Sequence, residues 1–237
     1  MTKLYFAAAE YKQKLFKQYE IKNILISYFS KPKIYEYKGF NIFLDSGAYS
    51  AFTQKKEIDL NEYIKFIKKN EKRLTVYASL DVIGDAEKTY SNFKIMKEAR
   101  LNPIPTFHIG SDFKWLEKYK NEPYIALGGM VPYTARPSLL KKWLKKCFNI
   151  IPKTTKVHAF GMTNPTIVRL FPFNSLDSTS WLTYSVWGNW IKYEKHKFIK
   201  IDKKIANNPK TNKLLQKWNL VQYIKFAKHL EERKWNT

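Results

Sequence analysis

Several short apolar runs in the sequence end in a residue that could take part in chemistry. Three carboxylates, Asp45, Asp81 and Asp177, each directly follow a leucine, and His108 follows Phe107. Glycines end two further runs, at Gly128-Gly129 and Gly161. An aspartate after a strand can be only a turn or cap residue. If the runs are parallel strands of a barrel, however, their carboxyl ends meet at one mouth, and that coincidence favours a single polar pocket.

Two aspartates in one pocket suit glycosyl transfer with retention of configuration. One carboxylate attacks the anomeric carbon while the other transfers a proton to or from the departing and entering groups. A third carboxylate can accept hydrogen bonds from the N–H edge of guanine. The sequence has no Ser-His-Asp order, no phosphate-binding glycine loop and no metal-ligand spacing. These residues therefore favour a glycosylase.

The elements that must position these residues alternate along the chain. Apolar periodicity predicts strands at 24–29, 40–44, 74–80, 104–107, 124–127, 156–160 and 173–176. Helices are expected after the caps Asp59, Asp85 and Asn164, from Ser138, and over 214–235. Such alternation indicates right-handed βαβ units. Seven or eight units in 237 residues favour an α/β fold of the (β/α)₈ TIM-barrel type over an open sheet. We expect one domain, 1–237, in which about 183–237 form a basic, helical C-terminal extension.

The charge of the chain points to a polyanionic partner. Lys and Arg number 43 against 20 Asp and Glu, which gives a net charge of +23. Residues 191–237 alone hold 13 basic and 4 acidic residues. A general compositional bias toward lysine is the alternative, but release of counterions from phosphates favours nucleic-acid binding. Six lysines near Trp187, Trp190 and Tyr193 are the candidates for phosphate binding: Lys192, Lys195, Lys197, Lys200, Lys203 and Lys204. The alternative is that these lysines only form a solvated helix face.

Other classes of protein are disfavoured by composition. One cysteine, Cys147, and four histidines cannot supply a cysteine-rich zinc cluster, so we expect no metal and no cofactor. No apolar run approaches the roughly 20 residues that span a bilayer, and the first residues do not form a signal peptide. We therefore expect a cytoplasmic protein with no membrane partner.

Five short motifs resemble those of tRNA-guanine transglycosylases. The segment 44–50, Leu-Asp-Ser-Gly-Ala-Tyr-Ser, resembles the Asp-Ser-Gly-Gly-aromatic-Gln motif of that family. Ser79-Leu80-Asp81 resembles its second base-binding strand, 126–130 its Gly-Gly-Leu loop, and 158–162 its Leu-Met-Gly strand. Asp177 falls in order where the family has its nucleophilic aspartate. The resemblance spans about residues 40–180.

This resemblance implies roles for the residues of the pocket. Asp177 would attack C1′ of a guanosine or deoxyguanosine to form a covalent glycosyl-enzyme, and Asp45 would protonate the departing guanine. Asp45 would then deprotonate an incoming 7-deazaguanine base, such as a queuosine precursor. Tyr49 and Phe160 would sandwich the base, although a core aromatic is the alternative for both. The residues expected to contact the base are Ser46, Gly47, Tyr49, Asp81, His108, Gly128, Gly129, Met130, Phe160 and Gly161.

Departures from the family pattern bear on the substrate. Ala48 and Ser50 replace a glycine and a glutamine of the first motif, and His108 stands where the family has glutamine, so a merely buried histidine is its alternative. The zinc module of the tRNA enzymes is absent. The chain thus resembles the compact, zinc-free relatives of phages and bacterial DNA-modification clusters, and we expect DNA as partner. The alternatives are the same exchange on tRNA, hydrolytic removal of the base, or a non-catalytic barrel that binds nucleic acid.

Overall fold

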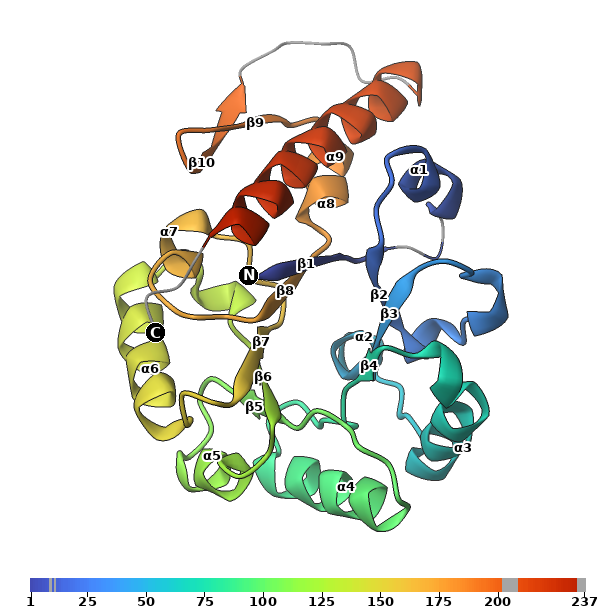
Figure 1. The fold of residues 1–237 in the computed structure, drawn as a ribbon, viewed down its shortest axis with the longest axis vertical. Coiled ribbons are helices and arrows are strands. Elements are labelled where there is room, and N and C mark those ends of the chain that lie inside the picture. Colours follow the sequence, from blue (N-terminus) through green and yellow to red (C-terminus); the bar gives the residue numbers. More distant parts are fainter. Residues whose placement is uncertain (9, 11, 202–208, 234–237) are drawn as a thin grey trace.

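The computed structural model describes residues 1–8, 10, 12–201 and 209–233. Eight parallel strands form one sheet in the order β4-β3-β2-β1-β8-β7-β6-β5, so that all strands adjacent in sequence except β4 and β5 lie side by side. The sheet curls into a half-barrel with helices on its outer face (Figure 1). Its strands are β1 (Lys3–Phe6), β2 (Asn23–Ser27), β3 (Asn41–Asp45), β4 (Val76–Tyr77), β5 (Thr106–His108), β6 (Tyr124–Gly128), β7 (Lys156–Ala159) and β8 (Ser175–Ser178).

Helices connect the strands and cover the sheet. They are α1 (Gln13–Gln18), α2 (Ala48–Thr53), α3 (Leu60–Asn70), α4 (Ala86–Glu98), α5 (Lys114–Tyr119), α6 (Pro137–Ile150), α7 (Pro165–Val168), α8 (Ser180–Val186) and α9 (Pro209–Glu232). Short 3₁₀ turns, η2 (Tyr28–Ser30), η3 (Ile34–Glu36), η4 (Glu71–Arg73) and η5 (Val131–Tyr133), lie between them. Within the described ranges, no helix is long and apolar enough to cross a bilayer.

Capping residues fix where three of the helices begin. The side chains of Asp59 and Asp85 accept hydrogen bonds of 2.8 Å from the backbone N–H groups three residues later. Asn164 accepts from the N–H of Thr166 at 3.0 Å. Each bond satisfies an N–H group that the first helical turn leaves without an intrahelical partner. The helix starts predicted at these three residues are confirmed.

The two edge strands of the sheet approach each other without forming a ladder. One parallel bridge pairs Ala78, just after β4, with Ile104, just before β5. The N–H of Ser79 donates to the carbonyl of Ile104 at 2.8 Å, and the N–H of Ile104 donates to that of Tyr77 at 2.9 Å. The predicted parallel α/β architecture is confirmed, and the sheet is TIM-like but not closed by a continuous ladder.

Alternate strand residues point to the inside of the curled sheet. A buried cluster distinct from the main core collects inward side chains from most of the strands: Tyr5, Ala7, Leu25, Phe43, Ala78, Ile104 and Ala126, with Phe160 packed against them. The main core lies between the sheet and the surrounding helices. Because side chains alternate with period two along a strand, Asp45 follows Phe43 on the inward side. Asp177 pairs in register with the inward-facing Tyr5 of β1, so its side chain points to the same side.

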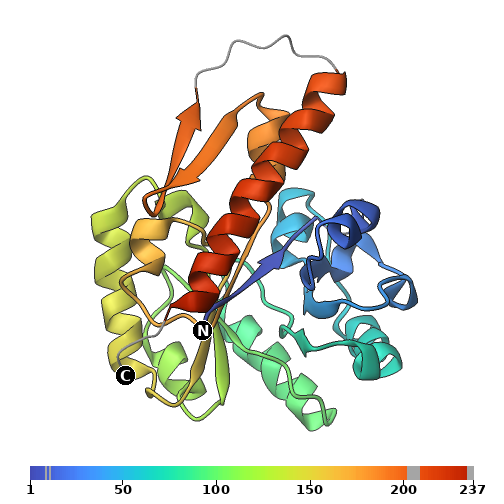
Figure 2. The ribbon, with the colours of Figure 1, turned by 45° about the horizontal axis from the view of Figure 1, so that its top comes forward.

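The C-terminal part is not wholly helical, which corrects the expectation for 183–237. Between α8 and α9, the strands β9 (Trp190–Glu194) and β10 (Lys197–Ile201) form an antiparallel hairpin. Side chains of α9 hold this hairpin, because Asn219 and Gln222 accept hydrogen bonds of 3.1 Å from the N–H groups of Ile191 and Tyr193. Figure 2 shows α9 running alongside β1 and α8, with the hairpin standing beyond the sheet. Tertiary hydrogen bonds thus override the helical pattern here.

Candidate active site

Asp45 ends β3 and faces the other carboxylates of the mouth. Its Oδ2 accepts a hydrogen bond of 3.0 Å from the N–H of Gly47. Burial is the main cause that raises the pKa of Asp45 to about 8, and the negative charges of Asp81 and Asp177 add to the rise. The three carboxylates are therefore close enough to interact electrostatically. At neutral pH, Asp45 carries a proton that it can donate.

Asp81 lies in a network of hydrogen bonds just past β4. The hydroxyl of Ser46 donates to Asp81 Oδ1 at 2.6 Å and itself accepts from the N–H of Ala48 at 3.2 Å. Nε2 of His108, at the end of β5, lies 2.9 Å from Asp81 Oδ2. Both oxygens of Asp81 are thus held in place, one by the turn after β3 and one by the end of β5. A carboxylate fixed in this way is suited to accept the N–H groups of a ligand.

Two glycines leave room for this arrangement. Gly47 has a φ of +81°, and a Cβ there would lie 2.5 Å from Phe29 Cβ and from Ser27 Oγ. A Cβ on Gly128 would lie 2.7 Å from Cδ2 of His108. Gly47 therefore allows the turn that follows Asp45, and Gly128 allows the imidazole of His108 to lie against the backbone of β6.

Asp177 lies inside β8 and is almost fully buried. Its Oδ1 accepts a hydrogen bond of 2.8 Å from the N–H of Gly161 and lies 3.2 Å from Nε2 of His158. Both contacts end on Oδ1, and no hydrogen bond to Oδ2 occurs within the described part of the chain. Asp177 thus has one carboxylate oxygen fixed by donors and a second one that makes no hydrogen bond within the described residues.

The aromatic residues expected to sandwich a base lie in different settings. The ring of Phe160 packs inside the sheet, 5.6 Å from the ring of Phe43 and 4.5 Å from that of His158. Tyr49, in the first turn of α2, is 69% exposed. Met130 is buried, and Gly129 precedes it with a φ of +73°. Phe160 is therefore partly a core residue, whereas the side chain of Tyr49 lies in solvent.

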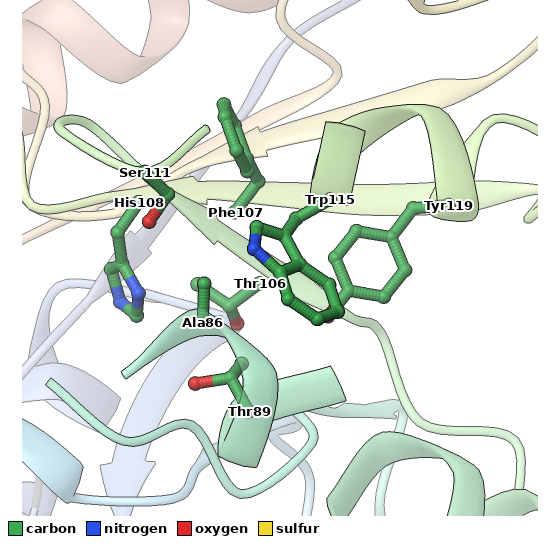
Figure 3. Close-up of a pocket in the computed structure, with 8 residues that line it drawn as sticks. All are labelled: Ala86, Thr89, Thr106, Phe107, His108, Ser111, Trp115 and Tyr119. Carbon is green, nitrogen blue, oxygen red and sulfur yellow. The ribbon is translucent and has the colours of Figure 1, made fainter. Parts of the chain in front are cut away.

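A small hollow lies behind His108, on the helix side of β5 (Figure 3). It is lined by residues of α4, β5 and α5, among them Thr89, Trp115 and Tyr119. The hollow is too narrow to admit a water molecule. It therefore cannot hold a purine, and the mouth between the carboxylates is the better candidate for a base. In the described ranges, no group of three or more His, Cys, Asp or Glu side chains could hold a metal ion.

The lysines expected to bind phosphate lie on the hairpin. Lys192 lies in the middle of β9, Lys195 lies in the turn, and Lys197 and Lys200 lie in β10; all four are exposed. Lys192 forms an ion pair of 3.0 Å with Glu194. Trp187 follows the last residue of α8, precedes these lysines in the sequence and is 75% exposed. The two remaining candidates, Lys203 and Lys204, lie outside the described residues.

Sequence reasoning assigned no role to three polar residues beneath Asp177. The imidazole of His158 is fully buried and lies between Asp177 and the hydroxyl of Ser175. Tyr124, on β6, reaches the same hydroxyl. The period of two could have found them, because Ser175 precedes Asp177 by two residues and His158 precedes Phe160 by two.

Comparison with protein-family models and with curated proteins finds no match to this chain. The resemblance of its motifs to the transglycosylases therefore stays a prediction.

Proposed function

We propose that the protein is a glycosylase that exchanges guanine in nucleic acid for a 7-deazaguanine base. The observation that carries this proposal is the contrast between two aspartates of one mouth. Asp45 has a pKa of about 8 and holds a proton at neutral pH. Asp177 is oriented by a backbone N–H group and by His158. Carboxyl groups whose environments differ in this way can divide the roles of acid and nucleophile.

The proposed reaction has two steps that balance. An oxygen of Asp177 bonds to C1′ as the bond from C1′ to guanine breaks. Guanine keeps the electron pair of the broken bond and takes the proton of Asp45. In the second step, the incoming base gives its N–H proton to Asp45 and bonds to C1′, which releases Asp177. The configuration at C1′ is retained because it is inverted twice. Asp81 and His108 would bind the edge of the base, and Gly129 and Met130 its carbonyl.

We favour DNA as the polymer. The net charge of +23 and the exposed lysines of the hairpin support a phosphate grip. A base in a duplex must leave the stack to reach a buried aspartate, which costs a few kcal/mol that such a grip can offset. We also propose that the fold is a closed (β/α)₈ barrel. The bridge between Ala78 and Ile104, which joins the two edges of the sheet, supports this.

Covalent trapping tests the proposal. The wild-type protein is incubated with end-labelled guanine-containing duplex DNA, single-stranded DNA or tRNA, and then resolved on a denaturing gel. We expect a DNA adduct that Asp177→Asn abolishes and that Asp59→Asn, an exposed cap carboxylate outside the mouth, preserves. The absence of an adduct on every polymer would contradict the covalent mechanism. If Asp177→Asn removed binding itself, a non-catalytic nucleic-acid-binding barrel would explain the protein better.

A further inference from the structure

A chain of hydrogen bonds leads from the inside of the sheet to Asp177. The hydroxyls of Tyr124 and Ser175 lie 2.6 Å apart, and Ser175 Oγ lies 2.5 Å from Nδ1 of His158. On its other side, Nε2 of His158 lies 3.2 Å from Asp177 Oδ1. The four residues come from three adjacent strands, β6, β7 and β8. They end on the one carboxylate that the proposed reaction uses as nucleophile.

Aromatic packing fixes the plane of the His158 ring. Its centroid lies 4.5 Å from those of Phe43 and Phe160 and 6.3 Å from that of Tyr5. None of these rings makes a hydrogen bond to the imidazole within the described residues, so its polar contacts lie only along the two nitrogen directions. A buried polar chain destabilises a protein unless its members satisfy one another. Here every member has a partner in the chain.

The directions of the hydrogen bonds follow from the protonation of the imidazole. Burial lowers the pKa of His158 even though Asp177 opposes that shift, so the ring is neutral and has one N–H group. If Nε2 carried no hydrogen, its lone pair would face an oxygen of Asp177 at 3.2 Å, which is repulsive when the carboxylate is ionised. With the hydrogen on Nε2, Nδ1 accepts from Ser175, and Ser175 in turn accepts from Tyr124. This is the arrangement in which every donor has an acceptor.

We propose that Tyr124 and Ser175 hold His158 in its Nε2–H tautomer, and that His158 thereby positions Asp177 for attack. The role given to Asp177 rests on the proposed function, whereas the tautomer of His158 does not depend on it. His158 is a positioning residue, because it acts on substrate only through Asp177. Its hydrogen bond engages Oδ1 and leaves Oδ2 without a hydrogen bond from the described residues. Supporting hydrogen bonds of this kind, in metal sites, are worth about 10- to 100-fold in affinity or activity.

The tautomer can be measured without any substrate. Long-range ¹H–¹⁵N correlation spectra of protein with ¹⁵N-labelled histidine distinguish the two neutral tautomers and the cation, and His158→Gln assigns the signal among four histidines. We expect the neutral Nε2–H tautomer at pH 7 in wild type, with a second tautomer gained in Ser175→Ala. The Nδ1–H tautomer or an imidazolium in wild type would overturn the inference.

The effect on catalysis is measured on the same variants. Ser175→Ala and Tyr124→Phe should lower kcat of base exchange about 10- to 100-fold with little change in KM for nucleic acid, and Ser175→Thr should restore activity. Tyr77→Phe is the matched control, because it removes a hydroxyl hydrogen-bonded to Glu71 and to the N–H of Asn102. Thermal melting confirms that each variant folds.

The outcomes separate the two proposals. Exchange by wild type with unchanged kcat in Ser175→Ala would refute the positioning role and leave the proposed function intact. Equal losses of kcat in Ser175→Ala and in Tyr77→Phe would also refute it, because they would indicate a general effect of lost stability. If the wild-type protein showed the predicted tautomer but exchanged no base on any polymer, the proposed function would be refuted. The hydrogen-bond chain would still be supported.

Discussion

Replacing Asp45 by asparagine should stabilise the protein in a way that grows with pH. In the folded chain the pKa of Asp45 is raised from 3.8 to about 8, mainly by burial. Between these pH values the folded state keeps the proton that the unfolded state has lost. The contribution of Asp45 to stability is therefore fully present below about pH 4 and is lost as pH rises to about 8. The amide of the variant has no such titration.

The size of the effect follows from the pKa difference. Each pKa unit corresponds to about 1.36 kcal/mol, so the shift of Asp45 amounts to roughly 6 kcal/mol at most. Part of the side chain still meets solvent, which reduces this figure, and we expect roughly 2 to 5 kcal/mol. Asp45→Asn and wild type should be about equally stable near pH 4, because a protonated carboxyl and an amide have similar shapes.

Urea unfolding between pH 4 and pH 9 measures this difference. The free energy of unfolding of Asp45→Asn minus that of wild type should rise from near zero to a plateau above about pH 8. Asp59→Asn is the control, because Asp59 is an exposed helix cap whose replacement should give no comparable rise. A difference that does not vary with pH, or that favours wild type at pH 9, would refute the assignment of a raised pKa to Asp45.

Three further predictions follow from the same structure. If Asp45 is the general acid, kcat/KM of base exchange should fall about tenfold per pH unit above about pH 8; a flat profile to pH 10 would count against that role. Gly47→Ala should lower the free energy of unfolding by more than about 2 kcal/mol in urea titrations, because it adds a clash. Gly39→Ala, with a similar φ of +83° but open space, should have the smaller effect. Replacing Lys195 and Lys197 by alanine should reduce the slope of log K against log salt for DNA by about 2; an unchanged slope would exclude the hairpin from the phosphate contacts.

The positions of the candidate site residues could be predicted from the sequence because they follow strands. A buried parallel strand is an apolar run, and a polar residue at its end stands out. Asp45, His108 and Gly128 occupy the last positions of β3, β5 and β6. Their convergence on one mouth follows from parallel pairing, which alternating strands and helices indicate.

The hairpin of β9 and β10 could not be predicted from local signals. Its turn consists of Lys195 and His196, which have φ values of +47° and +60° without the glycine or asparagine that such turns favour. The hydrogen bonds that hold its first strand come from Asn219 and Gln222, nearly thirty residues away. Local periodicity carries no information on such contacts. The strand β1 was also missed, because its four residues precede a short alanine-rich stretch and give little pattern.

The chemistry of the carboxylates depends on environments that sequence does not reveal. Nothing in the residues around Asp45 indicates that it keeps a proton at neutral pH. That property comes from burial and from charges 36 and 132 residues away in the chain, on Asp81 and Asp177. The role proposed for His158 likewise depends on Ser175, which only the pairing of β7 with β8 brings close.

A base-exchange assay follows the proposed reaction itself. The purified protein is incubated with DNA and, separately, with tRNA, each carrying labelled guanine, with and without added 7-deazaguanine bases. We predict release of labelled guanine from DNA that requires the added base, with no release by Asp177→Asn. Release from tRNA alone would contradict the choice of DNA, release without any added base would indicate a hydrolase, and no release from either polymer would contradict the account.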